Sequence, residues 1–369
     1  MYDINSEQHE YPLLNQAQLK SPGFPGRLSS VFSKTSASYK YFWFISILDL
    51  FCLDHKIKIP MQEIIATIIA NAWYSIHYFK LSFGRSDSLY QAVIDLQKIT
   101  SLPIDADKTL IIKTLIENKD DSRIKPILKI FTLNVPYRFL SPWIKYTSDS
   151  DIVKRSQSFE NNCLYAITGN IEKEIVINPN WADYLKDNYK ILMDFCYWNL
   201  SDFVQSRNPN VPNIQSKLIK PIKRNSLSKQ QQYWNRYISH KGSIRCIYTD
   251  NMLLARDYDL DHFMPWSFVS HDLIWNLLPI DSSINSSKSN RIPSLSKFLP
   301  SFVQLHHSAL IYTYNADPNN RLIEDYQSIG ASVDELVHME YESFYDLYNK
   351  TIAPLSQIAI NTGFVKWEY

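Results

Sequence analysis

Glycine is scarce in this sequence. Only seven glycines occur in 369 residues, whereas average usage of about 7% would give roughly 26. No spacing among them matches G-x-G-x-x-G or G-x-x-x-x-G-K-[S/T], the loops that hold nucleotide phosphates through close backbone contacts. A dinucleotide-binding fold or a P-loop built on glycine contacts is therefore excluded.

Cysteine and long apolar runs are also scarce. The four cysteines lie far apart, at positions 52, 163, 196 and 246, and form no C-x-x-C pair. We therefore expect neither a disulfide framework nor a structural zinc ion. The most apolar run, residues 41–53, is interrupted by Asp49 and is too short to span a bilayer. The polar, acidic N-terminus does not look like a signal peptide, so we expect a soluble cytoplasmic protein without membrane contact.

Charge is nearly balanced overall but unevenly distributed. The net charge is +1. Residues 213–300 hold 12 Lys and Arg against 6 Asp and Glu, whereas residues 301–369 hold 3 against 9. A basic block in a neutral chain fits a local contact with a polyanion. A charged stretch that is merely solvated fits the composition equally well.

The length predicts two domains or three small ones, and the apolar patterning predicts a mainly α fold with a small α+β part. Apolar residues recur at helical spacing in residues 87–99 and 106–118. Residues 39–53 are apolar on all sides, which predicts a buried helix, and further helices are predicted over 60–81, 181–204 and 228–239. Gly169-Asn170 lies between two apolar runs, 163–168 and 171–177, which is typical of a hairpin. After residue 300 the chain is expected to be helical and acidic to its end.

A domain boundary is predicted at residues 208–225. This stretch contains three prolines, few large apolar side chains and rising positive charge, which are features of a linker. Residues 1–207 then form a mainly helical region without readable chemistry, assigned to recognition of a substrate or partner. Residues 226–300 form the domain with the chemistry, and residues 301–369 form an acidic helical extension that packs on it.

The chemistry lies between residues 258 and 293. The segment reads as a strand ending in Asp261-His262, a polar and aromatic loop, a second strand over residues 276–280, and a helix with Asp281 as its N-cap. Such a unit brings Asp261, His262 and Asn285 together where the strand and helix face each other. A carboxylate and an amide oxygen suit Mg²⁺, with Mn²⁺ as a substitute. A neutral histidine beside them can take a proton from an attacking water.

This segment resembles the ββα-metal motif of HNH endonucleases, most closely the HNH domain of RNA-guided CRISPR effector nucleases. The matching residues are Asp259, Asp261, His262, Pro265, Ser267, Phe268, Asn276, Asn285, Lys288, Ser289 and Pro293. The resemblance covers residues 240–295. No second nuclease motif is visible, so it does not imply guide-directed cutting.

The resemblance implies a role for each residue of the motif. His262 is the general base, and Asp261 and Asn285 are the metal ligands. Asn276 holds the loop and orients the histidine, and Asp259 assists at the metal. An asparagine at position 285, where many HNH proteins have histidine, favours Mg²⁺ over softer metals. The cysteine pairs that often brace the motif with zinc are absent apart from Cys246, so packing by Trp266, Trp275 and Phe268 is expected to replace the zinc.

Basic residues around the motif are predicted to contact DNA phosphates. A basic stretch runs into it, formed by Lys217, Lys220, Lys223, Arg224, Lys229, Arg236, Lys241 and Arg245. Lys288 and Arg291 lie on or just after the helix and are assigned to the cleaved strand. A solvated linker is the alternative interpretation of the basic stretch.

The sequence thus predicts a metal-dependent DNA endonuclease that hydrolyses double-stranded DNA. Chains that join an HNH domain to an unrelated helical region resemble effectors of bacterial restriction or anti-phage defence, which implies an ATPase or sensor as partner protein. Two alternatives stay open: a catalytically inert DNA- or partner-binding protein with a nuclease fold, and a homing enzyme or RNase with the same chemistry.

Overall fold

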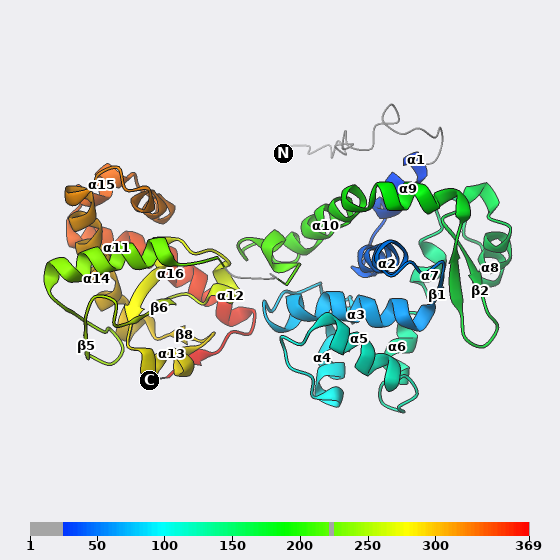
Figure 1. The fold of residues 1–369 in the computed structure, drawn as a ribbon, viewed down its shortest axis with the longest axis horizontal. Coiled ribbons are helices and arrows are strands. Elements are labelled where there is room, and N and C mark those ends of the chain that lie inside the picture. The colour runs from blue at the N-terminus through cyan, green and yellow to red at the C-terminus, as the bar shows by residue number, and fades with distance from the viewer. Residues whose placement is uncertain (1–24, 221–224, 369) are drawn as a thin grey trace, which may run out of the picture. The chain divides into compact units, whose positions relative to one another are not determined.

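A computed structural model describes residues 25–220 and 225–368 (Figure 1). The chain divides into two compact units. Unit 1 comprises the residues up to His77 together with Ser82–Arg207, and unit 2 comprises Tyr78–Leu81 together with the residues from Asn208 onward. Helices dominate both units and the sheets are small, which confirms the predicted fold class. In the part of the chain that is described, no helix is long and apolar enough to cross a membrane.

Unit 1 is built mainly from helices. These are α1 (Pro25–Ser29), α2 (Tyr39–Leu48), α3 (Met61–His77), α4 (Ser88–Thr100), α5 (Lys108–Glu117), α6 (Lys125–Ile130), α7 (Val135–Arg138), α8 (Asp149–Gln157), α9 (Ala182–Asp187) and α10 (Tyr189–Gln205). Shorter helical turns are η3 (Ser30–Phe32), η4 (Asp49–Leu53), η5 (Glu160–Asn162) and η6 (Pro179–Trp181). Its strands are β1 (Lys58–Pro60), β2 (Tyr165–Thr168) and β3 (Glu174–Ile177).

Helix α2 forms the centre of unit 1. It is apolar on nearly all sides, as a fully buried helix must be, and its residues from Tyr41 to Leu48 are buried. It packs against α3 and α10 (Figure 1). The following turn, η4, has π-helical geometry and begins at Asp49. The carboxylate of Asp49 accepts hydrogen bonds from Lys108 Nζ at 2.5 Å and Tyr189 Oη at 2.9 Å, so it ties α2 to α5 and α10.

Helix α3 is shorter than the pattern over residues 60–81 predicts. It begins at Met61, because Pro60 ends strand β1, and it ends at His77. The three-stranded sheet has the order β1-β3-β2, so Pro60 lies on an edge strand, where its missing N–H breaks no ladder hydrogen bond. Residues Tyr78–Leu81, which continue the apolar pattern, belong to unit 2.

The predicted hairpin is present as β2 and β3, which pair antiparallel. Its turn requires glycine at position 169, where φ is +85° and an added Cβ would lie 2.1 Å from the Glu172 carbonyl oxygen.

The single helix expected over residues 181–204 is divided at Asn188. The Asn188 side chain donates a hydrogen bond to the Tyr184 carbonyl at 2.8 Å, and this local bond competes with continuation of the helix.

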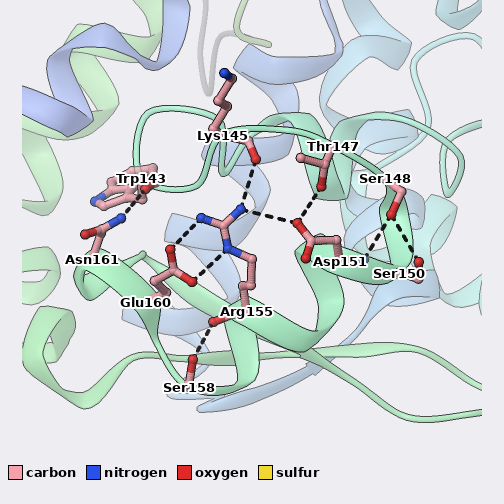
Figure 2. A network of polar contacts seen from close by, with 10 residues as sticks. All are labelled: Trp143, Lys145, Thr147, Ser148, Ser150, Asp151, Arg155, Ser158, Glu160 and Asn161. Atoms are coloured by element: carbon pink, nitrogen blue, oxygen red, sulfur yellow. Dashed lines mark hydrogen bonds and ion pairs between the residues drawn. The ribbon is translucent and has the colours of Figure 1, made fainter.

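A polar network around Arg155 fixes the loop that precedes α8 (Figure 2). The guanidinium contacts both carboxylate oxygens of Glu160, at 2.7 and 2.5 Å. It also donates to Asp151 Oδ2 and to the Lys145 carbonyl, each at 3.2 Å. Arg155 lowers the pKa of the Glu160 carboxyl, as a fork-shaped pairing should. The network therefore joins the loop, α8 and η5.

In its described residues, unit 2 combines helices with three two-stranded sheets. Its helices are α11 (Ser228–Lys241), α12 (Trp266–Val269), α13 (Ser282–Lys288), α14 (Leu295–Ala316), α15 (Val333–His338) and α16 (Tyr341–Asn361). Its helical turns are η7 (Ile214–Lys217), η8 (Ile274–Asn276) and η9 (Arg321–Ile329). Its strands are β4 (Ile244–Arg245), β5 (Met252–Leu253), β6 (Asp259–His262), β7 (Leu277–Ile280), β8 (Ile292–Pro293) and β9 (Lys366–Trp367).

Two parts of unit 2 differ from the boundaries that the sequence suggests. Helix α14 begins at Leu295 and continues through Pro300, so it crosses the boundary placed at residue 300. The stretch 208–218, expected as part of a linker, packs inside the unit, and its residues Asn208, Val211 and Ile214 are buried. Proline content and charge indicated a linker, but these buried side chains anchor the segment in the core.

Candidate active site

A strand, loop, strand and helix form the site. Strand β6 pairs antiparallel with β7, with His262 opposite Leu277 and Asp259 opposite Ile280, and α13 packs on β6. Helix α13 begins where the sequence predicts, because the Asp281 carboxylate accepts a hydrogen bond from the Ser283 amide at 2.9 Å. Hydrogen bonds from Asn251 and Ser283 lower the pKa of Asp281 to about 2, so the cap is ionised at neutral pH.

Asn276 clamps the chain that follows His262. Its side chain is fully buried, accepts a hydrogen bond from the Met264 amide at 2.8 Å and donates one to the Met264 carbonyl at 2.9 Å. Its own carbonyl accepts from the Phe263 amide at 2.8 Å. An amide side chain that satisfies both backbone groups of one residue fixes the path of that loop.

His262 lies at the end of β6 and contacts Asp272. Its Nε2 is 3.0 Å from Asp272 Oδ1, and the residue is 7% exposed. Because an ionised carboxylate can only accept, this contact requires the imidazole proton on Nε2. The next histidine, His271, is neutral at physiological pH, since burial lowers its pKa to about 4.

Asp259 sets the orientation of the Asn285 amide. The Asn285 Nδ2 donates to Asp259 Oδ2 at 3.0 Å. Asn285 Oδ1 makes no hydrogen bond with any residue within 25–220 or 225–368, so the oxygen remains as a ligand atom. The structure thus brings Asp259, the residue predicted to assist at the metal, into contact with Asn285, one of the two predicted ligands.

Lys288 differs from the surface cation that the sequence suggests. It is fully buried, its ammonium donates to the His262 carbonyl at 2.6 Å, and it lies 2.7 Å from Asp261 Oδ2. That oxygen is buried and accepts no hydrogen bond of good geometry from a described residue, so the Lys288 contact is an ion pair. Because α13 ends against β6, the Lys288 ammonium points into the site's interior, which does not fit a direct phosphate contact.

The ligand set fits a hard divalent cation. Asp261 contributes a carboxylate whose Oδ2 is paired with Lys288, so Oδ1 is the oxygen available to a cation, and Asn285 contributes an amide oxygen. Mg²⁺ takes few protein oxygens of this kind and keeps several waters. Among the described residues, no group of three or more His, Cys, Asp or Glu side chains is placed to hold a metal ion. The fit therefore depends on the amide of Asn285 rather than on an acidic or histidine cluster.

Aromatic residues from the C-terminal segment brace α13. The Trp367 ring packs on Tyr248 and Phe298, at 4.9 and 5.9 Å between centroids, and its Nε1 donates to Ser287 Oγ at 3.2 Å. Strand β9 pairs with β8 just after α13. The expected brace of Trp266, Trp275 and Phe268 omitted Trp367, because the end of the chain is remote from the motif in sequence.

Cys246 lies next to the start of α13. The Asp281 amide donates to its Sγ at 3.4 Å. The neighbouring Tyr248 phenol is fully buried, and burial, followed by the charge of Asp261, raises its pKa.

The predicted DNA-contacting residues have different surroundings. Arg291 is exposed, and Arg245 is exposed with an ion pair to Asp250 at 3.3 Å. Lys223 and Arg224 lie outside the described residues. Lys217 is fully buried and donates to the Phe268 carbonyl at 2.6 Å, a position that excludes a phosphate contact in this structure.

Asp272 is the site residue that the sequence did not indicate. It lies in the loop between α12 and η8, and its only local signal is a carboxylate ten positions after the histidine. A single aspartate in a polar loop is ordinarily solvated, so no residue pattern separates it from other loop carboxylates.

Comparison with known families identifies the same segment. Residues 246–294 match the family model described as HNH endonuclease, which confirms the predicted HNH family for this part of the chain. Searches of curated proteins and of solved structures found no significant match. The family assignment therefore rests on unit 2, and the match does not extend into unit 1.

Proposed function

We propose that this chain, with its HNH endonuclease segment, is a Mg²⁺-dependent endonuclease that hydrolyses DNA phosphodiester bonds. One observation carries the proposal: Asp261 and His262 at the end of β6 lie in one ββα unit with Asn285 on α13, and Asn276 clamps the intervening loop. The residues supply a base and hard oxygen ligands for one phosphodiesterase site.

The reaction assigns a task to each side chain. His262 takes a proton from a water, whose oxygen attacks the phosphorus, while the bond to the 3′ oxygen breaks and that oxygen receives a proton from solvent. Asp261 and Asn285 would hold Mg²⁺, which supplies charge stabilisation for the phosphate and the leaving oxygen. Asp259 keeps the Asn285 oxygen directed away from itself through its contact with Nδ2.

Double-stranded DNA is the substrate we propose, with Arg245, Arg291, Lys223 and Arg224 as phosphate contacts. The exposed side chains of Arg245 and Arg291 near the site support this part of the proposal. We further assign the protein to restriction or anti-phage defence in the cytoplasm, with an ATPase or sensor as partner. That assignment rests on the build of the chain, in which a helical unit accompanies the HNH segment.

His262→Ala tests the proposal. Plasmid DNA and RNA are incubated with the purified full chain in Mg²⁺ or in EDTA. We expect DNA cleavage in Mg²⁺ that stops in EDTA, and a loss of about 10²–10⁴-fold in the variant, because a general base contributes that much. DNA affinity should change little, since the imidazole neutralises no phosphate.

His338→Ala is the matched control. His338 is an exposed residue of α15 whose Nδ1 contacts the Asp334 carbonyl, and its variant should cleave at the wild-type rate. Wild-type cleavage by His262→Ala, or undiminished cleavage in EDTA, would contradict the proposed mechanism. Cleavage of RNA but not of DNA would change the proposed substrate to RNA and leave the proposed catalytic site unchanged.

A further inference from the structure

We propose that Asp272 is a positioning residue for His262, which it keeps in the tautomer that has the proton on Nε2 and a free lone pair on Nδ1. The inference rests on the proposed nuclease function of the same site. It adds a residue outside the set that the motif supplies.

The contact is direct and shielded from water. Asp272 Oδ1 lies 3.0 Å from His262 Nε2, and the two side chains are 21% and 9% exposed. No other described residue donates a hydrogen bond to the Asp272 carboxylate, and none forms a hydrogen bond with His262 Nδ1. The two ring nitrogens of His262 therefore have different surroundings. Nε2 contacts a fixed acceptor, whereas Nδ1 has no hydrogen-bond partner among the described residues.

The loop that carries Asp272 is anchored at both ends. Before it, Asn213 Nδ2 donates to the Val269 carbonyl at 2.8 Å. At Asp272 itself, the backbone carbonyl accepts from Gln230 Nε2 at 3.0 Å. After it, the Asp325 carboxylate accepts from the Ile274 amide at 2.8 Å. A loop held by three separate segments can keep the Asp272 carboxylate in one position. A loop aspartate that is only solvated would not need such anchoring.

These anchors have a further consequence. Asn213, Gln230 and Asp325 all lie outside residues 246–294, the stretch that matches the HNH family. Hence the orientation of His262 depends on parts of unit 2 that are not part of the motif.

The contact assists the proposed reaction in two ways. It presents Nδ1 as the atom that accepts the proton from water, since a ring nitrogen with its own proton cannot do so. When Nδ1 takes that proton, the imidazole becomes a cation, and the adjacent Asp272 carboxylate stabilises it. The proton stays on His262 until solvent removes it, and Asp272 itself remains ionised throughout.

The tautomer can be measured without turnover. In protein labelled with ¹⁵N at histidine and free of metal, long-range proton–nitrogen correlation shows which ring nitrogen carries the proton, at a pH well above the usual histidine pKa of about 6.5. The His262 signal is identified by its loss in His262→Gln. We expect the proton on Nε2 in the wild type, and a mixture of both tautomers in Asp272→Asn, because an amide can face Nε2 with either its oxygen or its NH₂ group.

The kinetic measurement separates positioning from stability. A general base contributes about 10²–10⁴-fold, so Asp272→Asn should lower kcat by about 10–10³-fold, with KM nearly unchanged. Asp346→Asn is the matched control, because it removes the same charge at an exposed position of α16, away from the anchors of this loop. It should keep the wild-type tautomer and kcat.

The outcomes distinguish the inference from the function on which it rests. A proton on Nδ1 in the wild type, or an unchanged tautomer and kcat in Asp272→Asn, overturns the role of Asp272 while cleavage itself stands. A wild type without nuclease activity overturns the proposed function, and the tautomer measurement still decides whether Asp272 orients the ring. Equal losses in Asp272→Asn and Asp346→Asn would show an effect that does not depend on the contact with His262, and would also overturn the role.

Discussion

Two lysines that the sequence suggests as phosphate contacts are buried. Lys217 and Lys288 are each 0% exposed, and their ammonium groups donate to the carbonyls of Phe268 and His262, respectively. A buried cation must be hydrogen-bonded or paired, because its desolvation is expensive. Both lysines therefore act on the backbone on either side of the loop after His262.

Lys217→Met should make the stability of unit 2 less dependent on pH. Burial lowers the pKa of Lys217 from 10.5 to about 7. Between these values the unfolded chain binds more protons than the folded chain, so the contribution of Lys217 to the free energy of unfolding rises with pH, by at most about 1.4 kcal/mol per pH unit. It is lost as the pH falls through about 7.

Urea unfolding of the wild type and Lys217→Met at pH 7, 8 and 9 measures this difference. We expect the unfolding free energy of the wild type minus that of Lys217→Met to increase from pH 7 to pH 9. Lys229→Met, at an exposed position of α11, should follow the wild type at every pH. A difference, wild type minus variant, that stays constant or decreases would show that the Lys217 ammonium is charged in the folded protein over this range.

At the scale of elements, strand β9 helps to hold α13 in place. Strand β9 pairs parallel to β8, with Pro293 opposite Trp367. Trp367 is 1% exposed and joins α13 through Ser287. In a small ββα unit, such packing supplies support that a short motif cannot provide from its own core.

Trp367→Ala should destabilise unit 2 by about 3–5 kcal/mol, as expected for the loss of a buried aromatic side chain. The free energy of unfolding of the full chain, followed by circular dichroism in urea, measures it. Val365→Ala is the control on the same strand segment, because Val365 is 64% exposed and surface substitutions usually stay within about 0.5 kcal/mol. Equal values for the two variants would contradict a bracing role for Trp367.

At the scale of the whole molecule, unit 2 takes a short segment from early in the chain. Tyr78–Leu81 belongs to it, the Phe79 ring lies 5.9 Å from that of Trp266, and Lys80 Nζ lies 5.9 Å from the ring of Phe364. Phe79 is 1% exposed. The division into two units is therefore spatial and does not follow one cut in the sequence.

A fragment of residues 208–369 should consequently be less stable than the same unit in the full chain. It keeps the motif, whose strands and helix are local in sequence, but lacks the buried Phe79. We expect its urea midpoint to lie below that of unit 2 in the full chain, and Phe79→Ala in the full chain to reproduce most of the shift, since Phe→Ala in a core costs about 3–5 kcal/mol. Matching midpoints for the fragment and the wild type would show that Tyr78–Leu81 contributes nothing to unit 2.

The sequence by itself determined what depends on neighbours along the chain. Helices α4 and α5, the β2–β3 hairpin and the ββα order from Asp259 to Lys288 follow from local periodicity, a turn glycine and an N-cap. The strand, loop, strand and helix follow one another within a short segment, and this local order places Asn285 on α13 beside strand β6, where it contacts Asp259. The HNH family could be identified for the same reason.

Only the tertiary structure decided what depends on remote partners. Segments distant in sequence bury Lys217 and Lys288 in the core. They also supply the side chain that covers α13 and the surroundings in which Tyr78–Leu81 packs. A lysine or aspartate has the same local signal in either environment, because burial and hydrogen-bond partners are properties of the packed chain. That is why the sequence indicates His262, whereas the carboxylate that contacts it, Asp272, emerges only from the fold.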